Sequence, residues 1–446
     1  GGLDTVKSEE DSKLTITGGK FVSDYAPKYN VTGTILVYGE TAITGGEFVQ
    51  NSTSTAARVV VTGVVEGHTP SLTKVSGGKF TTKSSGAIFH GLGKATWDNF
   101  EVSGGTFNKS ISDGYCADGF IPTKNADGTY GVKEGKFVAD VGSTGYETFD
   151  EAIDAANAST KSKTIYLREN VTVDHQIVID NAKGKTVTLD LKDFALTSTY
   201  AINTSIKNGS YALVNNTPLT IKNGTFAAGQ ARAIGALAAL TLNGATVTQT
   251  LTGGHACVAF CKEGQPYTIK NSTIDGAYAV CNFANNATIT ISGSKLNGTG
   301  NTLYHNGSNY GLTLTVTNTT ITSSGGCGVY ISGSTTAQEN AANQNGAGGH
   351  QKASFTGCTI SGAENGIEVK YTDLTLDGCT VSSTATGEPG YNQDNNGPAA
   401  SGFAVVSTDN AMNNATPKPE GTIIIKGNGS YTGLVGLGAL ESVKNT

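Results

Sequence analysis

The chain has 446 residues, 60 of them glycine, and its 36 acidic residues outnumber its 30 basic residues to give a net charge of −6. Because glycine weakens helix interiors, this composition argues against a mainly helical protein and suits strands separated by tight turns. The negative charge and the scarcity of arginine argue against nucleic acid as a partner. The most apolar segment, residues 233–242, is too short for a membrane span, which takes about 18 apolar residues.

Residues 1–115 repeat one short phrase, in which a double glycine is followed by a variable residue and a phenylalanine. The double glycines begin at positions 18, 45, 77 and 104, so successive copies are 27, 32 and 27 residues apart. A repeat of about 20 to 50 residues is typical of a solenoid, in which each coil buries its apolar face only against its neighbours. Apolar and polar residues alternate around each phrase, which favours strands. We therefore predict a first β-helical array over residues 1–115.

The repeat stops after this array. Residues 116–136 contain an Asp-Gly turn, Asp127-Gly128, between strand-forming residues. Such a turn is a strong local signal for a β-hairpin. We expect a hairpin-like transition that ends the first array.

One convincing helix follows, near residues 147–157. Its apolar residues recur at helical spacing, at Phe149, Ala152, Ile153 and Ala156. Thr148 and Glu151 have the spacing of a capping box. We expect this helix to cap the apolar end of a second β-helical array, with which it makes up residues 137–446.

In the second array the repeated phrase centres on an asparagine or a glycine. The centres are Asn223, Asn243, Asn271, Gly293, Asn318, Gly357 and Gly378. Two long loops interrupt the array, roughly residues 332–351 and 383–400, and both are rich in asparagine, glycine and alanine. Long loops on a regular scaffold are where binding function tends to lie.

The seven cysteines do not show the spacing of a disulfide framework or of a zinc site. Cys358 and Cys379 occupy the same place in neighbouring repeats. We expect them to lie above one another in the core as small buried side chains. The sequence predicts no metal site.

Several phrases together resemble a known family. They are the Gly-Gly-x-Phe repeats, the passage from Gly114 to Val132, the helix with the sequence Thr-Phe-Asp-Glu-Ala-Ile-Asp-Ala-Ala, and the segment Val187-Thr188-Leu189-Asp190-Leu191. The chain resembles secreted right-handed parallel β-helix proteins of the pectate-lyase-like superfamily, in the style of the adhesin-like repeat surface proteins of gut bacteria. The resemblance implies an all-β fold: a right-handed parallel β-helix, or solenoid, in two arrays, with a short capping helix before the second. It also implies an extracellular or cell-surface protein whose signal peptide has been removed.

Enzymes with the β-helix fold that this resemblance implies use catalytic residues that the present sequence lacks. Lyases need clustered carboxylates for calcium and a positioned Arg or Lys that removes a proton, and the arginines Arg58, Arg168 and Arg232 are too scattered for this role. Hydrolases similar to polygalacturonases use an adjacent Asp pair and a Gly-His-Gly sequence, and neither occurs in this chain. The sequence therefore leans towards a protein without catalytic activity. No cofactor is expected, apart from calcium if the chain is a lyase of an unfamiliar kind.

The best candidate binding residues lie around Glu368. If the apolar residues of its strand point inward, Glu368 and Lys370 share the outer face, and Tyr330 of the preceding coil lies about 4.8 Å from Glu368. The two long loops flank this patch and contribute His350, Tyr391 and Asp394. An aromatic ring for a sugar face, with carboxylate and amide groups for hydroxyls, would form a groove for a sugar chain. The alternative is an ordinary solvated face with one Glu–Lys pair.

Three functions remain open. The first is a non-catalytic surface module, adhesin-like, that binds polysaccharide or a host or matrix ligand along a lateral groove. The second is an atypical polysaccharide lyase or glycoside hydrolase, and the third is a structural spacer. Trp97, the single tryptophan, is either a core residue or an exposed platform for a sugar ring. The sequence favours the binding module and leaves the oligomeric state open.

Overall fold

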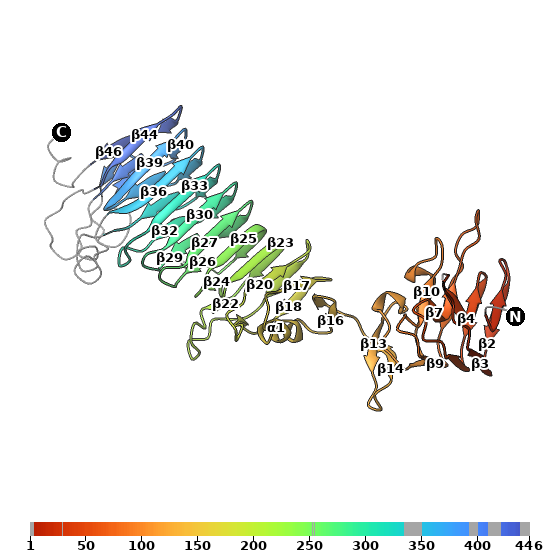
Figure 1. Cartoon of the computed structure of the whole chain (residues 1–446). Helices are drawn as coiled ribbons and strands as arrows, with labels where there is room; N and C mark the ends of the chain where they lie inside the picture. The colour runs from red at the N-terminus through yellow and green to blue at the C-terminus, as the bar shows by residue number, and fades with distance from the viewer. Residues whose placement is uncertain are drawn as a thin grey trace. The chain divides into compact units, whose positions relative to one another are not determined.

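The structure is a computed structural model that describes residues 4–28, 30–251, 253, 255–333, 350–391, 400–408 and 421–437. The chain forms two compact units, Gly1–Phe137 and Val138–Thr446. Strands dominate both units (Figure 1), and most strands pair in parallel with strands of neighbouring coils. The expected all-β, parallel β-helical fold is therefore confirmed. No helix among the described residues is long and apolar enough to cross a membrane.

The N-terminal unit is a stack of coils, each of which contributes one strand to each of three sheets. The first sheet contains β1 (Val6–Ser8), β4 (Thr32–Val37), β7 (Ala57–Thr62) and β10 (Phe89–Gly91). The second contains β2 (Lys13–Ile16), β5 (Glu40–Ile43), β8 (Thr73–Val75) and β11 (Phe100–Val102). The third contains β3 (Lys20–Ser23), β6 (Glu47–Gln50), β9 (Lys79–Thr82) and β12 (Thr106–Phe107). Two 3-10 turns, η1 (Trp97–Asn99) and η2 (Asp113–Tyr115), lie before β11 and after β12.

The third sheet ends in a hairpin. Its strands are β13 (Phe120–Lys124) and β14 (Tyr130–Glu134), which pair antiparallel. Tyr130 of β14 also pairs antiparallel with Phe107 of β12. The hairpin thus covers the edge of the parallel sheet, which would otherwise present unpaired backbone groups.

The two glycines of each repeated phrase have different structural roles. The second has a positive φ, +97° at Gly19 and +102° at Gly78, which glycine adopts at no steric cost. The first lies against the preceding coil, because a Cβ at Gly77 would be 2.3 Å from the carbonyl oxygen of Thr44. At Gly18, in the first coil, such a Cβ would have no neighbour within 4 Å. The phrase therefore combines a tight turn with close packing of coils.

The phenylalanines that follow the double glycines stack through the core. Ring centres are 5.2 Å apart for Phe21 and Phe48, 4.8 Å for Phe48 and Phe80, and 5.4 Å for Phe80 and Phe107. The last three rings are fully buried. Because burial of one such side chain contributes about 1.5–3 kcal/mol, this ladder holds the coils together.

In the C-terminal unit, a 20-stranded and a 10-stranded sheet are built from successive coils. The first strands of the coils in the large sheet are β17 (Lys163–Leu167), β20 (Val187–Asp190), β23 (Leu219–Ala228), β25 (Leu240–Gln249), β27 (Pro266–Lys270), β30 (Thr288–Ser292), β33 (Thr313–Thr317), β36 (Gln351–Thr356), β39 (Thr372–Asp377) and β44 (Ile423–Lys426). The second strands are β18 (Val171–Val173), β21 (Ala195–Ser198), β28 (Thr273–Gly276), β31 (Lys295–Gly298), β34 (Thr320–Ser323), β37 (Thr359–Gly362), β40 (Thr380–Ser383) and β45 (Ser430–Thr432), while β23 and β25 are long enough to fill both places.

The 10-stranded sheet receives one strand from each coil. Its strands are β19 (Ile177–Ile179), β22 (Tyr211–Asn215), β24 (Arg232–Ala236), β26 (Ala256–Phe260), β29 (Tyr278–Asn282), β32 (Leu303–His305), β35 (Val329–Ile331), β38 (Ile367–Val369), β43 (Phe403–Ser407) and β46 (Leu434–Leu437). Outside the coils, β15 (Ala139–Val141) and β16 (Thr144–Tyr146) form a hairpin that starts the large sheet, and β41 (Gly390–Tyr391) pairs with β42 (Ala400–Ser401).

An asparagine or glycine in the left-handed conformation stands at the corner between the two strands of a coil in the large sheet. The φ angle is +49° at Asn271, +46° at Asn318, and +60° at both Gly357 and Gly378. Of the residue types other than glycine, asparagine is among the few that tolerate this conformation, because its short side chain bonds locally. The repeated Asn-or-Gly position of the sequence is therefore a turn requirement.

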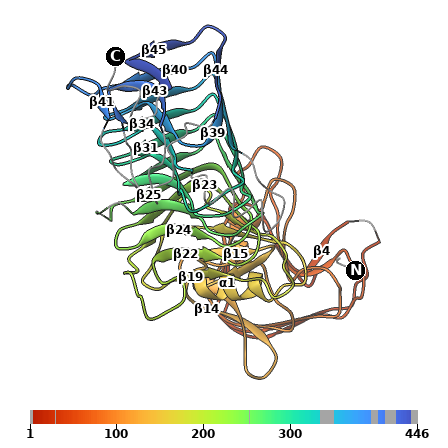
Figure 2. The ribbon, with the colours of Figure 1, turned by 90° about the vertical axis from the view of Figure 1, so that its left-hand side faces the viewer.

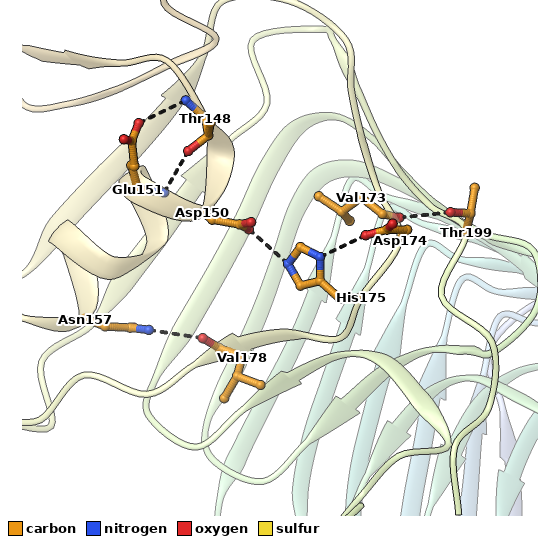
Figure 3. A network of polar contacts seen from close by, with 9 residues as sticks. All are labelled: Thr148, Asp150, Glu151, Asn157, Val173, Asp174, His175, Val178 and Thr199. Atoms are coloured by element: carbon orange, nitrogen blue, oxygen red, sulfur yellow. Dashed lines mark hydrogen bonds and ion pairs between the residues drawn. The ribbon is translucent and has the colours of Figure 1, made fainter.

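The helix α1 (Phe149–Asn157) confirms the expected helix and its capping box. The Thr148 hydroxyl accepts a hydrogen bond from the backbone N–H of Glu151, and the Glu151 carboxylate accepts one from the N–H of Thr148, both at 3.2 Å (Figure 3). The four predicted apolar residues are buried in the core of the C-terminal unit. At the other end, the Asn157 side chain donates to the carbonyl oxygen of Val178 in β19 at 3.1 Å. The helix packs against β15, β17 and β19, at the start of the stack.

The prediction that Cys358 and Cys379 stack in the core is confirmed. Both are buried, and the pairing of Thr359 with Thr380 places them in register in adjacent coils. Their thiols donate to backbone carbonyl oxygens, including that of Phe355 at 3.4 Å from the sulfur of Cys379. All seven cysteines are free thiols.

Candidate functional site

The 10-stranded sheet packs one face on the core and carries aromatic side chains on the other. Leu303 in β32 and Val329 in β35 belong to the core. Because successive residues of a strand point to opposite faces, Tyr304 and Tyr330 point outward. These two tyrosines are register partners in adjacent coils. In Figure 2, β22 and β24 of the same sheet lie in successive coils.

Three tyrosines form a ladder along this outer face. Ring centres are 5.8 Å apart for Tyr278 and Tyr304 and 5.7 Å for Tyr304 and Tyr330, and the planes are inclined by 12° and 26°. Tyr278 and Tyr304 are half-buried, whereas Tyr330 is fully buried. Gly300 makes room for the first ring, since a Cβ there would lie 2.4 Å from the ring of Tyr278. We refer to these three residues as the tyrosine ladder.

A cavity of about 430 Å³ opens beside the exposed end of the tyrosine ladder. Its lining includes the side chains of Gln249, Thr250, Asp275, Tyr278 and Thr299. The cavity therefore has one aromatic wall and several groups able to exchange hydrogen bonds. Pockets of this size, with an apolar wall and a few converging polar groups, are typical of small-ligand sites.

Gln249, one of the residues that line this cavity, has an unsatisfied acceptor. Its side chain is 5% exposed, and its amide nitrogen donates to the carbonyl oxygen of Leu251 at 2.9 Å. Its Oε1 atom is buried and has no hydrogen-bond partner in the part of the chain that the structure describes. Gly276 leaves space for this oxygen, because a Cβ there would lie 3.1 Å from it. An orphaned buried acceptor costs about 1–3 kcal/mol, so a local shift of the side chain that exposes this oxygen to a donor would recover part of that cost.

A positively charged group lies on the same face, one coil before β26. The guanidinium carbon of Arg232 is 5.7 Å from the ring centre of Tyr211, and Nε donates to Nδ1 of His255 at 3.3 Å. Burial, and then the charge of Arg232, lower the pKa of His255, which keeps its imidazole neutral. Burial also raises the pKa of Tyr278 and takes that of Tyr304 to about 12. The hydroxyls of Tyr278 and Tyr304 therefore stay protonated at neutral pH.

The structure brings together three of the residues proposed from sequence, but it does not expose them. Tyr330 and Glu368 are register partners, and Nζ of Lys370 is 5.5 Å from the ring centre of Tyr330 and 4.0 Å from Oε1 of Glu368. The exposed fractions of Tyr330, Glu368 and Lys370 are 0%, 0% and 1%. The expectation of a solvent-accessible outer face at these residues is therefore wrong. Their part in ligand binding stays a prediction.

The burial of Glu368 has a local cause. Its carboxylate accepts hydrogen bonds from the Asn365 side chain at 3.0 Å, the Thr408 hydroxyl at 2.9 Å and the Ala400 N–H at 3.3 Å. Ala400 begins β42 and Thr408 follows the end of β43, and the alternation of β38 could not place either of them beside Glu368. A buried carboxylate with three donors and a lysine is a satisfied structural group.

The remaining proposed residues belong to other surroundings. Nδ1 of His350 lies 2.9 Å from Oδ1 of Asp373, and its ring meets that of Tyr371 edge-on at 4.6 Å. Tyr391 ends β41, but its side chain lies outside the described residues, as does Asp394 altogether. In the described part of the chain, no three His, Cys, Asp or Glu side chains are grouped so as to hold a metal ion.

The cavity at Tyr278 was missed at the sequence level, although one signal pointed to it. The ladder tyrosines stand at positions 278, 304 and 330, which are 26 residues apart in each step. An aromatic residue repeated at the coil period predicts a stack on one face. The contribution of Gln249 could not be predicted, because it depends on the packing of two neighbouring coils.

Comparison with known proteins gives a likeness of fold only. No family model matches the sequence, and no curated protein sequence matches it. Among solved structures, the chain is similar to pectin methylesterase from Aspergillus niger, in its deglycosylated form and in its penultimately deglycosylated form. Each comparison has 13% sequence identity and a TM-score of 0.38, and covers 65% of this chain and 83% of the other.

Proposed function

We propose that the C-terminal unit binds a polysaccharide along the outer face of the 10-stranded sheet, with one sugar unit seated in the cavity at Tyr278. In this proposal the protein is a non-catalytic, adhesin-like module at the cell surface or outside the cell. Tyr278, at the exposed end of the tyrosine ladder, supplies a ring face for the apolar side of a sugar, and the polar groups around the cavity meet its hydroxyls.

The observation that carries the proposal is the buried, unpartnered Oε1 of Gln249 at an aromatic-walled cavity. A local shift of the Gln249 side chain would let this oxygen accept a hydrogen bond from a sugar hydroxyl, which can also accept from neighbouring hydroxyls. Asp275 adds a second acceptor. Because its carboxylate is negatively charged, we expect neutral sugars to bind better than uronic acids.

An atypical glycosidase on the same face is the competing function. Hydrolysis of a glycosidic bond commonly uses two carboxyl groups, about 5–5.5 Å apart in retaining enzymes and about 6.5–9.5 Å in inverting ones. Asp275 is the one acidic residue in the lining of the cavity, as far as the described residues go. This composition favours binding over bond cleavage.

The test is retention on immobilised plant, host and bacterial polysaccharides, with and without calcium, together with an assay for released sugar ends. Tyr278→Ala removes the aromatic wall. Tyr166→Ala serves as the matched control, because Tyr166 is a half-buried tyrosine of β17 in the other sheet.

The proposal predicts retention without release, and at least a tenfold loss of affinity in Tyr278→Ala only. A loss of about 1.4 kcal/mol corresponds to this factor and is within the range for one aromatic contact. Release of sugar ends would support the enzyme instead. Equal retention of Tyr278→Ala and Tyr166→Ala would mean that the ligand binds away from the cavity at Tyr278. If no polysaccharide retains the protein, a structural spacer becomes the better explanation.

A further inference from the structure

Trp97 is an exposed aromatic residue of the N-terminal unit, and its setting is that of a second binding site. The side chain is 58% exposed, so the alternative of a core residue is excluded. It stands at the start of η1, between β10 and β11. This location is separate from the tyrosine ladder, which belongs to the C-terminal unit.

The indole is held in place although it is exposed. A capping box fixes η1: the backbone N–H of Thr96 donates to the side chain of Asn99 at 2.9 Å, and the N–H of Asp98 donates to the Thr96 hydroxyl at 3.3 Å. The ring also packs on Gly114 of η2, where a Cβ would lie 3.2 Å from Cγ of Trp97. A rigid aromatic platform loses little conformational entropy when a ligand stacks on it.

A cavity of about 320 Å³ opens at this platform. It is lined by His90, Gly91, Thr96, Trp97, Asp98 and Tyr115. Tyr115 is fixed by a hydrogen bond from its hydroxyl to the carbonyl oxygen of Phe89 at 3.1 Å, and by edge-on packing against Phe100 at 5.2 Å. The lining thus combines two anchored aromatic rings with a carboxylate, an imidazole and a hydroxyl.

The charges around the cavity suit a neutral ligand with hydroxyl groups. Asp98 is an acceptor that already takes a hydrogen bond from the Thr96 hydroxyl at 3.2 Å. Burial, and then the charge of Arg58, lower the pKa of His90. His90 therefore presents a neutral imidazole, with one donor and one acceptor, at neutral pH. The nearby Arg58 charge disfavours a cationic ligand, which two aromatic rings and a carboxylate would otherwise attract.

We propose that this cavity is a second saccharide-binding site, in which one neutral sugar ring stacks on Trp97 and its hydroxyls bond to Asp98 and His90. The site goes beyond the function proposed for the C-terminal unit and does not depend on it. A chain with one site in each unit would bind a long polysaccharide more tightly than either site alone, where the linker lets both engage.

The test uses the fact that Trp97 is the single tryptophan of the chain. Its fluorescence, excited at a wavelength that tyrosine does not absorb, reports this cavity alone. The 446-residue chain is titrated with neutral hexasaccharides of glucose, mannose, xylose and N-acetylglucosamine, with oligogalacturonate and with choline. The same titrations are made on Asp98→Asn, on Asp118→Asn as an exposed acidic control outside the cavity, and on Tyr278→Ala.

The expected result is a saturable change in emission with at least one neutral hexasaccharide. We expect about tenfold weaker binding in Asp98→Asn, because a hydrogen bond to a charged carboxylate becomes a weaker one to a neutral amide oxygen, and unchanged binding in Asp118→Asn and Tyr278→Ala. No change in emission with any of the saccharides would overturn the proposal. A response to choline alone would also overturn it and would identify a cation site. Because Tyr278→Ala leaves Trp97 intact, failure here is distinguishable from failure of the site in the C-terminal unit.

Discussion

Replacing Glu368 with glutamine is expected to destabilise the C-terminal unit strongly. Glu368 and Lys370 are fully buried, and their charged atoms are 4.0 Å apart. The variant removes the negative charge and leaves the lysine charge in the interior. In the wild type, Asn365, Thr408 and Ala400 donate hydrogen bonds to the Glu368 carboxylate, and the variant places an amide NH₂, itself a donor, among these donors.

The expected loss follows from the separation of the charges. At 4 Å and an effective dielectric constant of about 20, the attraction between two unit charges is about 4 kcal/mol. Removing one partner of a buried pair costs about 3–5 kcal/mol, because the other charge is left uncompensated. We therefore expect Glu368→Gln to lower the free energy of unfolding by about 3–5 kcal/mol. The double variant Glu368→Gln/Lys370→Met is expected to lose clearly less than the sum of the two single variants.

The assay is urea unfolding followed by circular dichroism. Fluorescence of Trp97 reports the N-terminal unit and is expected to show an unchanged transition in all three variants. A loss below about 0.5 kcal/mol in Glu368→Gln would be that of an exposed residue and would refute the buried pair. If the wild-type protein releases sugar ends and a folded Glu368→Gln variant does not, Glu368 is catalytic and the structural interpretation is wrong.

Three further predictions concern the coils and their cap. Gly77→Ala is expected to cost the N-terminal unit about 1–3 kcal/mol, because its Cβ would meet a carbonyl oxygen at 2.3 Å, whereas Gly18→Ala, with open space, is expected to be tolerated; urea unfolding monitored by Trp97 measures both. Thr148→Ala is expected to cost about 1 kcal/mol in thermal unfolding of the C-terminal unit, since the cap of α1 is lost, and an unchanged midpoint would contradict the cap. The hydrogen bond to Asp174 is the largest effect on the pKa of His175 and raises it above 6.5; burial, the next largest, lowers it, and the charge of Asp150 raises it again (Figure 3). The stability that protonated His175 contributes is therefore complete below pH 6.5 and is lost as the pH rises through the raised pKa. We expect the unfolding midpoint of the C-terminal unit to fall as the pH is raised from 6 to 8, and to fall by more in the wild type than in His175→Ala.

The coil architecture could be predicted because local and long-range requirements coincide in the same residues. At Gly77 and Gly78, one glycine permits coil contact and the other permits the turn, so the pair recurs in successive coils of the N-terminal unit. The capping box is likewise formed by two residues that are three positions apart, Thr148 and Glu151. Such signals lie within one coil or one helix turn and can be read from the sequence.

The candidate site could be predicted only in part, because its properties depend on contacts between coils. The alternation of β38 places Tyr330 beside Glu368, but not the burial of both, which comes with hydrogen bonds from Ala400 and Thr408. The unpartnered oxygen of Gln249 depends on how Gly276 of the next coil packs on it. No pattern within a single repeat contains this information.

Hydrogen–deuterium exchange on the polysaccharide complex tests the central claim most directly. The cavity lining comes from three segments of successive coils, residues 249–251, 275–278 and 299–300. The account predicts slower exchange in these three segments when a retained polysaccharide is bound, and no change at the corners of the large sheet, such as Asn271 and Asn318. Protection at those corners, with none in the segments that line the cavity, would contradict it.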